Sequence, residues 1–151
     1  MVGAWTVTSS CLKVSGEVDM GTLGLNCTTA GITGSLQVTG KWTAKADGTY
    51  TDETVTTGEV ELALPASCLN ISGTTTTCER LGQVVPSLGY DSASCADAAS
   101  GGGCTCPATV KQNGWAGWVS TSVMTSGNYK TASNVLTLDS EANYAYCVAG
   151  S

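Results

Sequence analysis

The sequence predicts an all-β protein built as an antiparallel up-and-down β-barrel of roughly eight to ten strands. Its 151 residues include 23 Thr and 19 Gly but only 3 Pro, a composition rich in residues that suit strands and turns. No stretch shows the i, i+3, i+4, i+7 apolar spacing of a long amphipathic helix. No linker or repeat divides the chain, so residues 1–151 are expected to form one domain.

The clearest strand is GSLQVTGKWTAKA, at residues 34–46. Leu36, Val38, Trp42 and Ala44 fall on one face, and polar side chains fall on the other. This alternation is typical of a half-buried strand. The following Asp47-Gly48 step predicts a tight hairpin turn.

The next strand, TYTDETVTTGEVELALP at residues 49–65, alternates over its second half. Val60 and Leu62 are expected to face inward, and Glu59 and Glu61 outward. A bulge at Gly58 would reset this alternation. Without a bulge, a row of mainly polar residues also faces inward: Tyr50, Asp52, Thr54 and Thr56. A partly polar interior is a feature of a cavity rather than of a dry core.

The rest of the chain reads as short elements. The segment 78–87, CERLGQVVPS, is the best helical candidate, and 95–106 reads as an exposed loop pinned by cysteines. After 114 we expect a meander with turns at 125–128 and 132–134, whose strands include VLTL and YAYCV.

Eight cysteines in a small, charge-poor chain favour a disulfide framework and an oxidising compartment. They are Cys11, Cys27, Cys68, Cys78, Cys95, Cys104, Cys106 and Cys147. Eight cysteines allow about 105 pairings, so the connectivity stays open. Cys68 with Cys78 and Cys11 with Cys27 are two candidate pairs. Cys104 and Cys106 share a strand face, so each is expected to have a distant partner.

Three short motifs resemble lipocalins and their bacterial lipocalin-like relatives. They are Gly3-Ala4-Trp5 before the first strand, WTAKADGTYT at 42–51 and SGNYKTASNVLTL at 126–138. The resemblance implies a β-barrel that binds a small hydrophobic molecule at its open end, with Trp5 as a structural plug at the closed end. The arginine that lipocalins pack on this tryptophan has no counterpart, because the only arginine is Arg80, in mid-chain.

The sequence argues against an enzyme. It contains no His, the commonest general base, and its cysteines are expected to be oxidised. The acidic pairs Asp52/Glu53 and Glu59/Glu61 read as solvated surface or opposite faces of a strand, and Asp47-Gly48 reads as turn chemistry rather than a calcium loop. The absence of His and of C-x2-C spacing argues against zinc, so no metal or other cofactor is expected.

Charge limits the partners. Twelve acidic and six basic residues give a net charge of -6, which disfavours nucleic acid and anionic membrane surfaces. No apolar run is long enough for a transmembrane helix, and Met1 leads straight into the domain without a signal peptide. We therefore expect the mature region of a secreted, periplasmic or cell-surface protein, and favour a bacterial source.

The aromatic residues carry the functional hypothesis. The chain has no Phe, so every aromatic side chain also has a hydrogen-bonding group. The expected ligand-binding residues are Trp42, Tyr50, Asp52, Thr54, Trp115, Tyr129, Tyr144 and Tyr146. We expect a barrel that binds a small hydrophobic or amphipathic molecule. The alternative is a structural or interaction subunit with a filled barrel that self-associates through open edge strands.

Overall fold

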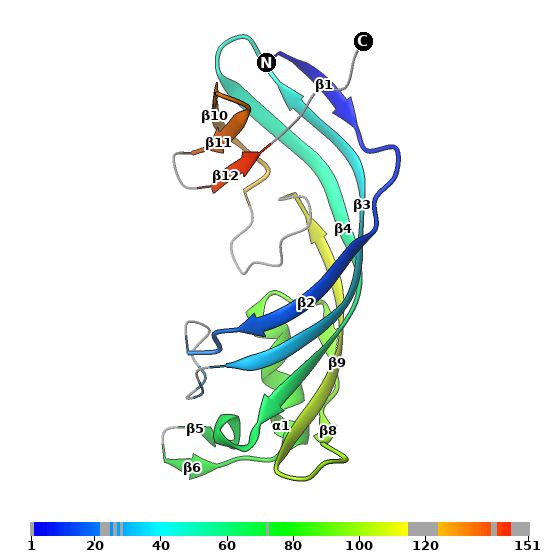
Figure 1. Cartoon of the computed structure of the whole chain (residues 1–151), viewed down its shortest axis with the longest axis vertical. Coiled ribbons are helices and arrows are strands. Elements are labelled where there is room, and N and C mark those ends of the chain that lie inside the picture. Colours follow the sequence, from blue (N-terminus) through cyan, green and yellow to red (C-terminus); the bar gives the residue numbers. More distant parts are fainter. Residues whose placement is uncertain are drawn as a thin grey trace.

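Two long antiparallel strands run the length of the molecule (Figure 1). In this computed structural model, which describes residues 2–21, 25, 27, 29–71, 73–114, 124–139 and 142–145, they are β3 (Ala30–Ala44) and β4 (Thr49–Pro65). The turn between them is the predicted Asp47-Gly48 hairpin. The Asp47 carboxylate accepts hydrogen bonds from the Thr49 amide and hydroxyl at 2.9 and 2.7 Å, which also lower the pKa of Asp47.

Shorter strands add to both sides of this hairpin and form one ten-stranded sheet. β1 (Gly3–Thr6) and β2 (Leu12–Val18) pair with successive parts of β3. On the other side, β9 (Gly103–Asn113) and β10 (Ser126–Ala132) pair with successive parts of β4. β7 (Ser92–Ala93) and β8 (Ala96–Asp97) extend the sheet beyond β9, while β11 (Val135–Leu138) and β12 (Ala142–Ala145) extend it beyond β10. β5 (Asn70–Ile71) and β6 (Thr74–Thr75) form a separate small hairpin.

The all-β, antiparallel prediction is confirmed, but the described strands form an open sheet and not a closed barrel. The reason is that each long strand serves two different neighbours along its length. β9 lies beside residues 55–65 of β4, and β10 lies beside residues 49–51, so the sheet divides into two ends. We call the end with β1 and β10–β12 the aromatic end, and the opposite end, which holds the disulfides, the disulfide end (Figure 1).

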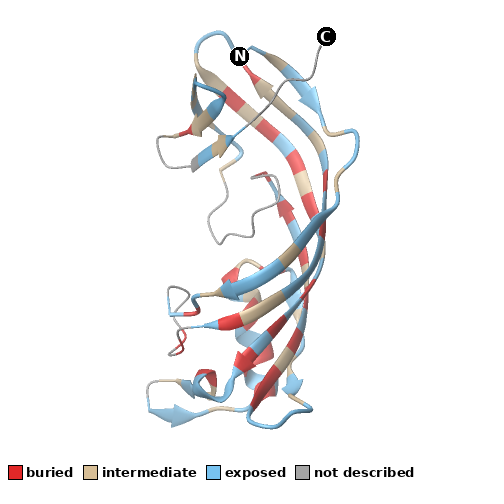
Figure 2. Ribbon diagram, viewed as in Figure 1, coloured by how far each residue is buried: buried red, intermediate tan, exposed pale blue. Residues whose placement is uncertain are grey.

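Pairing between β3 and β4 continues without a bulge from Gly31–Ala63 to Ala44–Tyr50. Gly58 is opposite Leu36 in this register, so it does not reset the alternation. Every second residue of β4 from Tyr50 to Leu64, apart from the half-buried Gly58, is therefore buried (Figure 2). The prediction of a partly polar interior is confirmed, because Asp52, Thr54 and Thr56 are buried with it.

The disulfide end holds the apolar core. Leu36, Leu62 and Val110 of the sheet pack there with Leu81 and Val85. The latter two come from the predicted helical segment, which forms α1 (Cys78–Val84) and a 3-10 turn at Val85–Leu88; a second 3-10 turn spans Ala66–Leu69. Thr77 begins α1 by accepting a hydrogen bond from the Arg80 amide at 3.4 Å, which satisfies one of the open N–H groups of the first turn.

Three disulfides close this end: Cys27–Cys68, Cys78–Cys104 and Cys95–Cys106. Cys104 and Cys106 each have a distant partner, as predicted. The candidate pairs Cys68–Cys78 and Cys11–Cys27 were wrong, because α1 and β9 bring other cysteines together across the core. Cys11 is exposed and is the one described cysteine without a disulfide, contrary to the prediction. Cys147 lies outside the described residues.

The C-terminal meander is confirmed in outline. Ser133 and Asn134 have positive φ angles of 50° and 61° and make the turn between β10 and β11. The predicted turn at 125–128 was wrong, because Ser126, Gly127 and Asn128 pair with β4 as part of β10. Within the described part of the chain, no helix has the length and apolar character needed to cross a membrane.

Gly58 provides the first test of this fold. A Cβ atom there would lie 2.3 Å from the Ser35 carbonyl oxygen, and its φ of +153° disfavours other residues. We expect Gly58→Ala to lower the free energy of unfolding by at least about 2 kcal/mol, from backbone strain and collision. Gly31→Ala is the control, since its Cβ would make an ordinary contact of 3.5 Å with Ala63. Equal urea midpoints for the two variants would contradict the close pairing of β3 and β4.

The disulfides provide the second test. Cys27–Cys68 spans 41 residues and Cys95–Cys106 spans 11, so the chain-entropy model assigns them about 4 and about 3 kcal/mol. In thermal unfolding, we expect the Cys27→Ala/Cys68→Ala variant to be less stable than the Cys95→Ala/Cys106→Ala variant.

Peptide mapping without reductant tests the connectivity of the disulfides. It should recover all three bridges, and a Cys11–Cys27 peptide would refute the pairing.

Candidate functional site

Four aromatic side chains meet at the aromatic end, with Trp42 at the centre. The Trp42 ring stacks on Tyr50 with centroids 5.6 Å apart and planes 24° apart. Tyr129 meets it edge-on at 5.9 Å, and Trp5 lies at 5.6 Å with a tilt of 41°. These four residues form what we call the aromatic cluster. Two of the predicted binding residues, Tyr50 and Tyr129, therefore contact a third, Trp42, and the three come from different strands.

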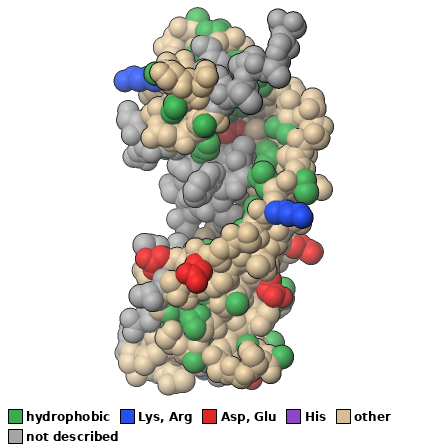
Figure 3. Space-filling model, viewed as in Figure 1, with side chains coloured by type: hydrophobic (Ala, Val, Ile, Leu, Met, Phe, Trp, Pro, Cys, Tyr) green, Lys and Arg blue, Asp and Glu red, His purple; other side chains and the backbone are tan. Residues whose placement is uncertain are grey.

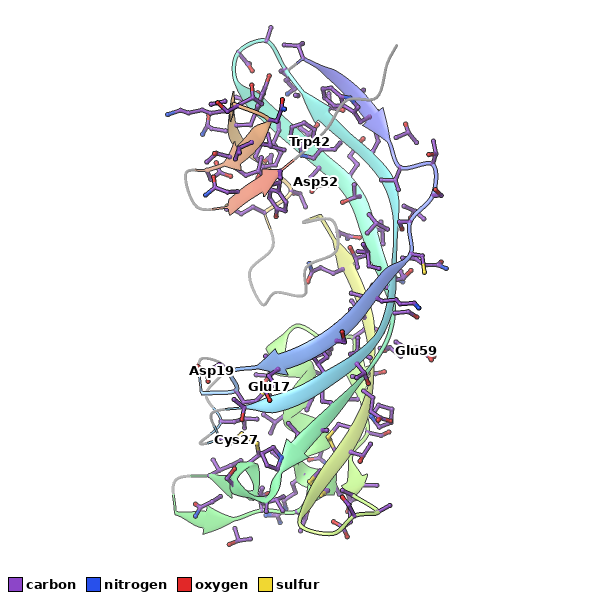
Figure 4. All side chains as sticks on the ribbon, in the orientation of Figure 1. Glu17, Asp19, Cys27, Trp42, Asp52 and Glu59 are labelled. Carbon is purple, nitrogen blue, oxygen red and sulfur yellow. A yellow bond between two sulfur atoms is a disulfide. The ribbon has the colours of Figure 1, made fainter. Side chains whose placement is uncertain are left out.

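A row of polar side chains adjoins the cluster on the inner face of β4. Asp52 is opposite Trp42 in the β3–β4 register and is only 5% exposed. Its Oδ1 atom accepts hydrogen bonds from the Thr54 amide at 2.9 Å and the Thr54 hydroxyl at 2.6 Å. Thr56 and Gln112, which are cross-strand neighbours, continue the row and are also buried. Figure 4 shows the contrast in direction on β4: Asp52 faces the inside of the bend and Glu59 the outside.

Asp139 ties the last strands to the hairpin. Its Oδ2 atom accepts a hydrogen bond from the Tyr50 hydroxyl at 3.0 Å, and Oδ1 accepts one from the Asn128 amide at 2.7 Å. The backbone carbonyl oxygen of Asn128 in turn accepts a hydrogen bond from the Asp139 amide at 2.9 Å. Gly127 leaves room for this carboxylate, since a Cβ atom there would lie 2.2 Å from Oδ2. β10 and β11 are thus fixed over Tyr50.

Tyrosines from β10 and β12 complete the inner side. The Tyr129 hydroxyl donates to the Lys45 carbonyl at 2.9 Å, which holds β10 against the β3–β4 turn. Tyr144 is half-buried on β12, where burial and the Asp52 charge raise its pKa. Burial, the hydrogen bond to Asp139 and nearby negative charges raise the pKa of Tyr50 far above its usual range. Both phenols therefore stay neutral at physiological pH.

Six of the eight predicted residues thus gather at the aromatic end: Trp42, Tyr50, Asp52, Thr54, Tyr129 and Tyr144. Trp115 and Tyr146 lie outside the described residues. Sequence reasoning missed Trp5, Gln112 and Asp139 as members of this region. The regular alternation along β9 could have predicted that Gln112 faces inward. Asp139 follows β11 with a positive φ angle, and no sequence pattern predicted its position.

Trp5 does not act as a buried plug. It lies on the edge strand β1 opposite Trp42, and 40% of its surface is exposed. The plug expectation came from the lipocalin resemblance and needs a closed barrel end around this residue. In the open sheet, Trp5 instead covers one side of the Trp42 ring.

Pockets among the described residues differ in size and in lining. The pocket that Tyr129 and Asp139 line has a volume of about 30 Å³, which suits about one water molecule. A broad hollow of about 960 Å³ lies over the outer face across β2, β3, β4, β7 and β9, where Glu59 and Glu61 point, as predicted, toward solvent. Its lining includes Ser15, Thr33 and Thr109 but no aromatic residue.

Other candidate chemistry is sparse. The described residues include no group of three or more His, Cys, Asp or Glu side chains placed to bind a metal ion. All six Lys and Arg residues are exposed, and on the face shown in Figure 3 the basic side chains stand apart rather than forming a patch. Lys41 and Glu53 form an exposed ion pair on the outer face, with Nζ and Oε2 3.5 Å apart.

The chain was compared with family models, curated proteins and solved structures, and none of them matches it. The lipocalin-like resemblance therefore remains a prediction that rests on its three short motifs.

Tyr50 provides the test of the site geometry. Tyr50→Phe keeps the ring stack but removes the hydrogen bond to Asp139, so we expect a loss of about 1.5–3 kcal/mol at neutral pH. The raised phenol pKa contributes stability that is fully present below pH 10, the ordinary value, and is lost progressively as the pH rises from there through the folded-state value. The stability gap between wild type and variant in urea unfolding should therefore be smaller at pH 11 than at pH 9. A gap that is the same at both pH values would contradict the buried phenol.

Proposed function

We propose that the protein is an extracellular, lipocalin-like binding module that takes a small amphipathic ligand at its aromatic end. The observation that carries this proposal is the inner face of β4. Where a purely structural sheet would bury aliphatic side chains, it has Tyr50, Asp52, Thr54 and Thr56. Buried polar groups beside aromatic rings are typical of ligand sites, which combine apolar walls with a few oriented polar groups.

The ligand would contact the half-buried rings rather than enter a closed chamber. Trp42, Tyr129 and Tyr144 are each partly accessible, while Tyr50 and Asp52 lie beneath them. A barrel that closes around this face would deepen the site in the manner of lipocalins. The three disulfides are compatible with an extracellular or other oxidising environment, which supports a secreted protein.

A neutral fluorescent probe such as N-phenyl-1-naphthylamine tests the binding proposal. We expect wild-type protein to bind it and Trp42→Leu to weaken binding about tenfold, a change of about 1.4 kcal/mol. Leu12→Ser is the control, because Leu12 is an exposed apolar residue on β2, away from the cluster. Absence of probe binding to wild-type protein, or equal affinities of the two variants, would refute the proposal.

A second candidate is self-association through the sheet edges, and the composition of the edge strands favours it. β1 reads Gly-Ala-Trp-Thr and β12 reads Ala-Asn-Tyr-Ala, without the charges or prolines that usually protect an edge. Among the described strands, β1 pairs only with β3 and β12 pairs only with β11. Val2 and Trp5 also expose apolar surface at the β1 edge.

Proline at position 4 tests this candidate. The Val7 amide donates a hydrogen bond to the Gly40 carbonyl of β3. In an antiparallel pair, every second residue makes such bonds to the partner strand. The N–H groups of Ala4 and Thr6 therefore point away from β3. Ala4→Pro therefore removes an outward donor without breaking the β1–β3 pairing. We expect wild type and the Ala4→Ser control to associate in sedimentation equilibrium and Ala4→Pro to remain monomeric. A wild-type monomer at all concentrations would exclude the candidate.

A further inference from the structure

The charges at the aromatic end are arranged asymmetrically about the sheet. On the inner face, Asp52 lies opposite Trp42, and Asp139 contacts the neighbouring Tyr50. Two basic residues of the sheet lie on the other face, while Lys45 and Lys130 of the aromatic end are exposed. Lys41 is exposed and paired with Glu53, and Lys111 is exposed at a position opposite the outward-facing Thr57. The inner face therefore carries negative charge, and no lysine or arginine of the chain is buried there.

The rings beside Asp52 add to this preference. The faces of tryptophan and tyrosine rings carry partial negative charge and attract cations within about 6 Å of the ring centre. Trp42 and Tyr129 are half-buried, so a ligand can reach them from solvent, whereas Asp52 lies behind Trp42 at the next strand. A carboxylate close to a desolvated site interacts with a cation more strongly than it does through bulk water.

The direction of the tyrosine pKa shifts agrees with this charge distribution. Burial is the main cause of the raised pKa of Tyr50 and Tyr144, and the nearby Asp52 carboxylate raises the pKa of both further. The phenols remain protonated and act as neutral hydrogen-bonding groups. They do not compensate the negative charge at this face.

We propose that the aromatic end selects amphipathic amines, with the cationic head group at the half-buried Trp42 and Tyr129 rings beside Asp52 and the apolar part against the half-buried Tyr144 ring. This inference rests on the proposed binding function and adds the chemical class of the ligand. The same arrangement disfavours fatty-acid-type ligands, because the Asp52 carboxylate would repel a second carboxylate, whereas the lysines of this end are exposed to solvent. A neutral ligand of the same shape is expected to bind with intermediate affinity.

Three ligands with one alkyl chain test the proposal: decylamine, decanol and decanoate, each below its micelle-forming concentration at pH 7. Displacement of the neutral naphthylamine probe gives their affinities for wild-type protein. We expect decylamine to bind about tenfold more tightly than decanol, and decanoate to bind most weakly. This ranking needs no variant, so it holds even if a substitution at position 52 impairs folding.

Two variants then locate the source of the preference. Asp52→Asn keeps an oxygen that can accept from Thr54 but removes the charge, and should equalise the affinities for decylamine and decanol. Glu53→Gln makes the same change in net charge on the outer face and should leave the preference intact. If Glu53→Gln abolished the preference for decylamine as fully as Asp52→Asn does, the cause would be general attraction to an acidic protein. The proposal would then fail.

The outcomes distinguish the amine preference from the proposed binding function. Binding of all three ligands with equal affinity, or tightest binding of decanoate, overturns the amine preference and leaves the binding function standing. Absence of both probe and decanol binding overturns the binding function, and the amine preference with it.

Discussion

The unbroken pairing of β3 with β4 is the constraint on which the rest of the structure depends. Fourteen consecutive pairs keep one register from Gly31–Ala63 to Ala44–Tyr50. In an antiparallel sheet a slip of one residue would move every side chain to the opposite face. The same register therefore buries Leu62 at one end and Asp52 at the other. Glycine at position 58 lets the two backbones stay in contact through the bend.

One inner face thus has two kinds of chemistry. At the disulfide end, aliphatic side chains and α1 form the apolar core, and three disulfides cross-link it. Such cross-links suit a small chain that buries little apolar surface elsewhere in its sheet. At the aromatic end, rings and buried polar groups replace the aliphatic residues. Buried polar groups cost free energy unless they are hydrogen-bonded, and Thr54 and Tyr50 make such bonds to Asp52 and Asp139. This polar end is where the structure departs from what stability alone requires, and it is the basis for the proposed ligand site.

Local signals in the sequence were enough to predict much of this structure. The alternation along β4, the Asp47-Gly48 turn and the 78–87 helix depend on near neighbours, and all three are confirmed. The convergence of Trp42 with Tyr129 followed from their shared inward facing. The cysteine partners did not follow, because Cys27–Cys68 depends on how distant segments pack. The division of the sheet was also beyond local reasoning, since it arises from β9 and β10 sharing one edge of β4.

Carboxyl footprinting tests the central claim most directly, because it reports which acidic side chains of β4 face solvent. Native protein is labelled with a carbodiimide and glycine amide, and the modified residues are identified by mass spectrometry. The account predicts rapid labelling of Glu53, Glu59 and Glu61 and strong protection of Asp52, which is 5% exposed. Labelling of Asp52 at the rate of Glu53 would contradict the continuous register and the buried charge at the aromatic end.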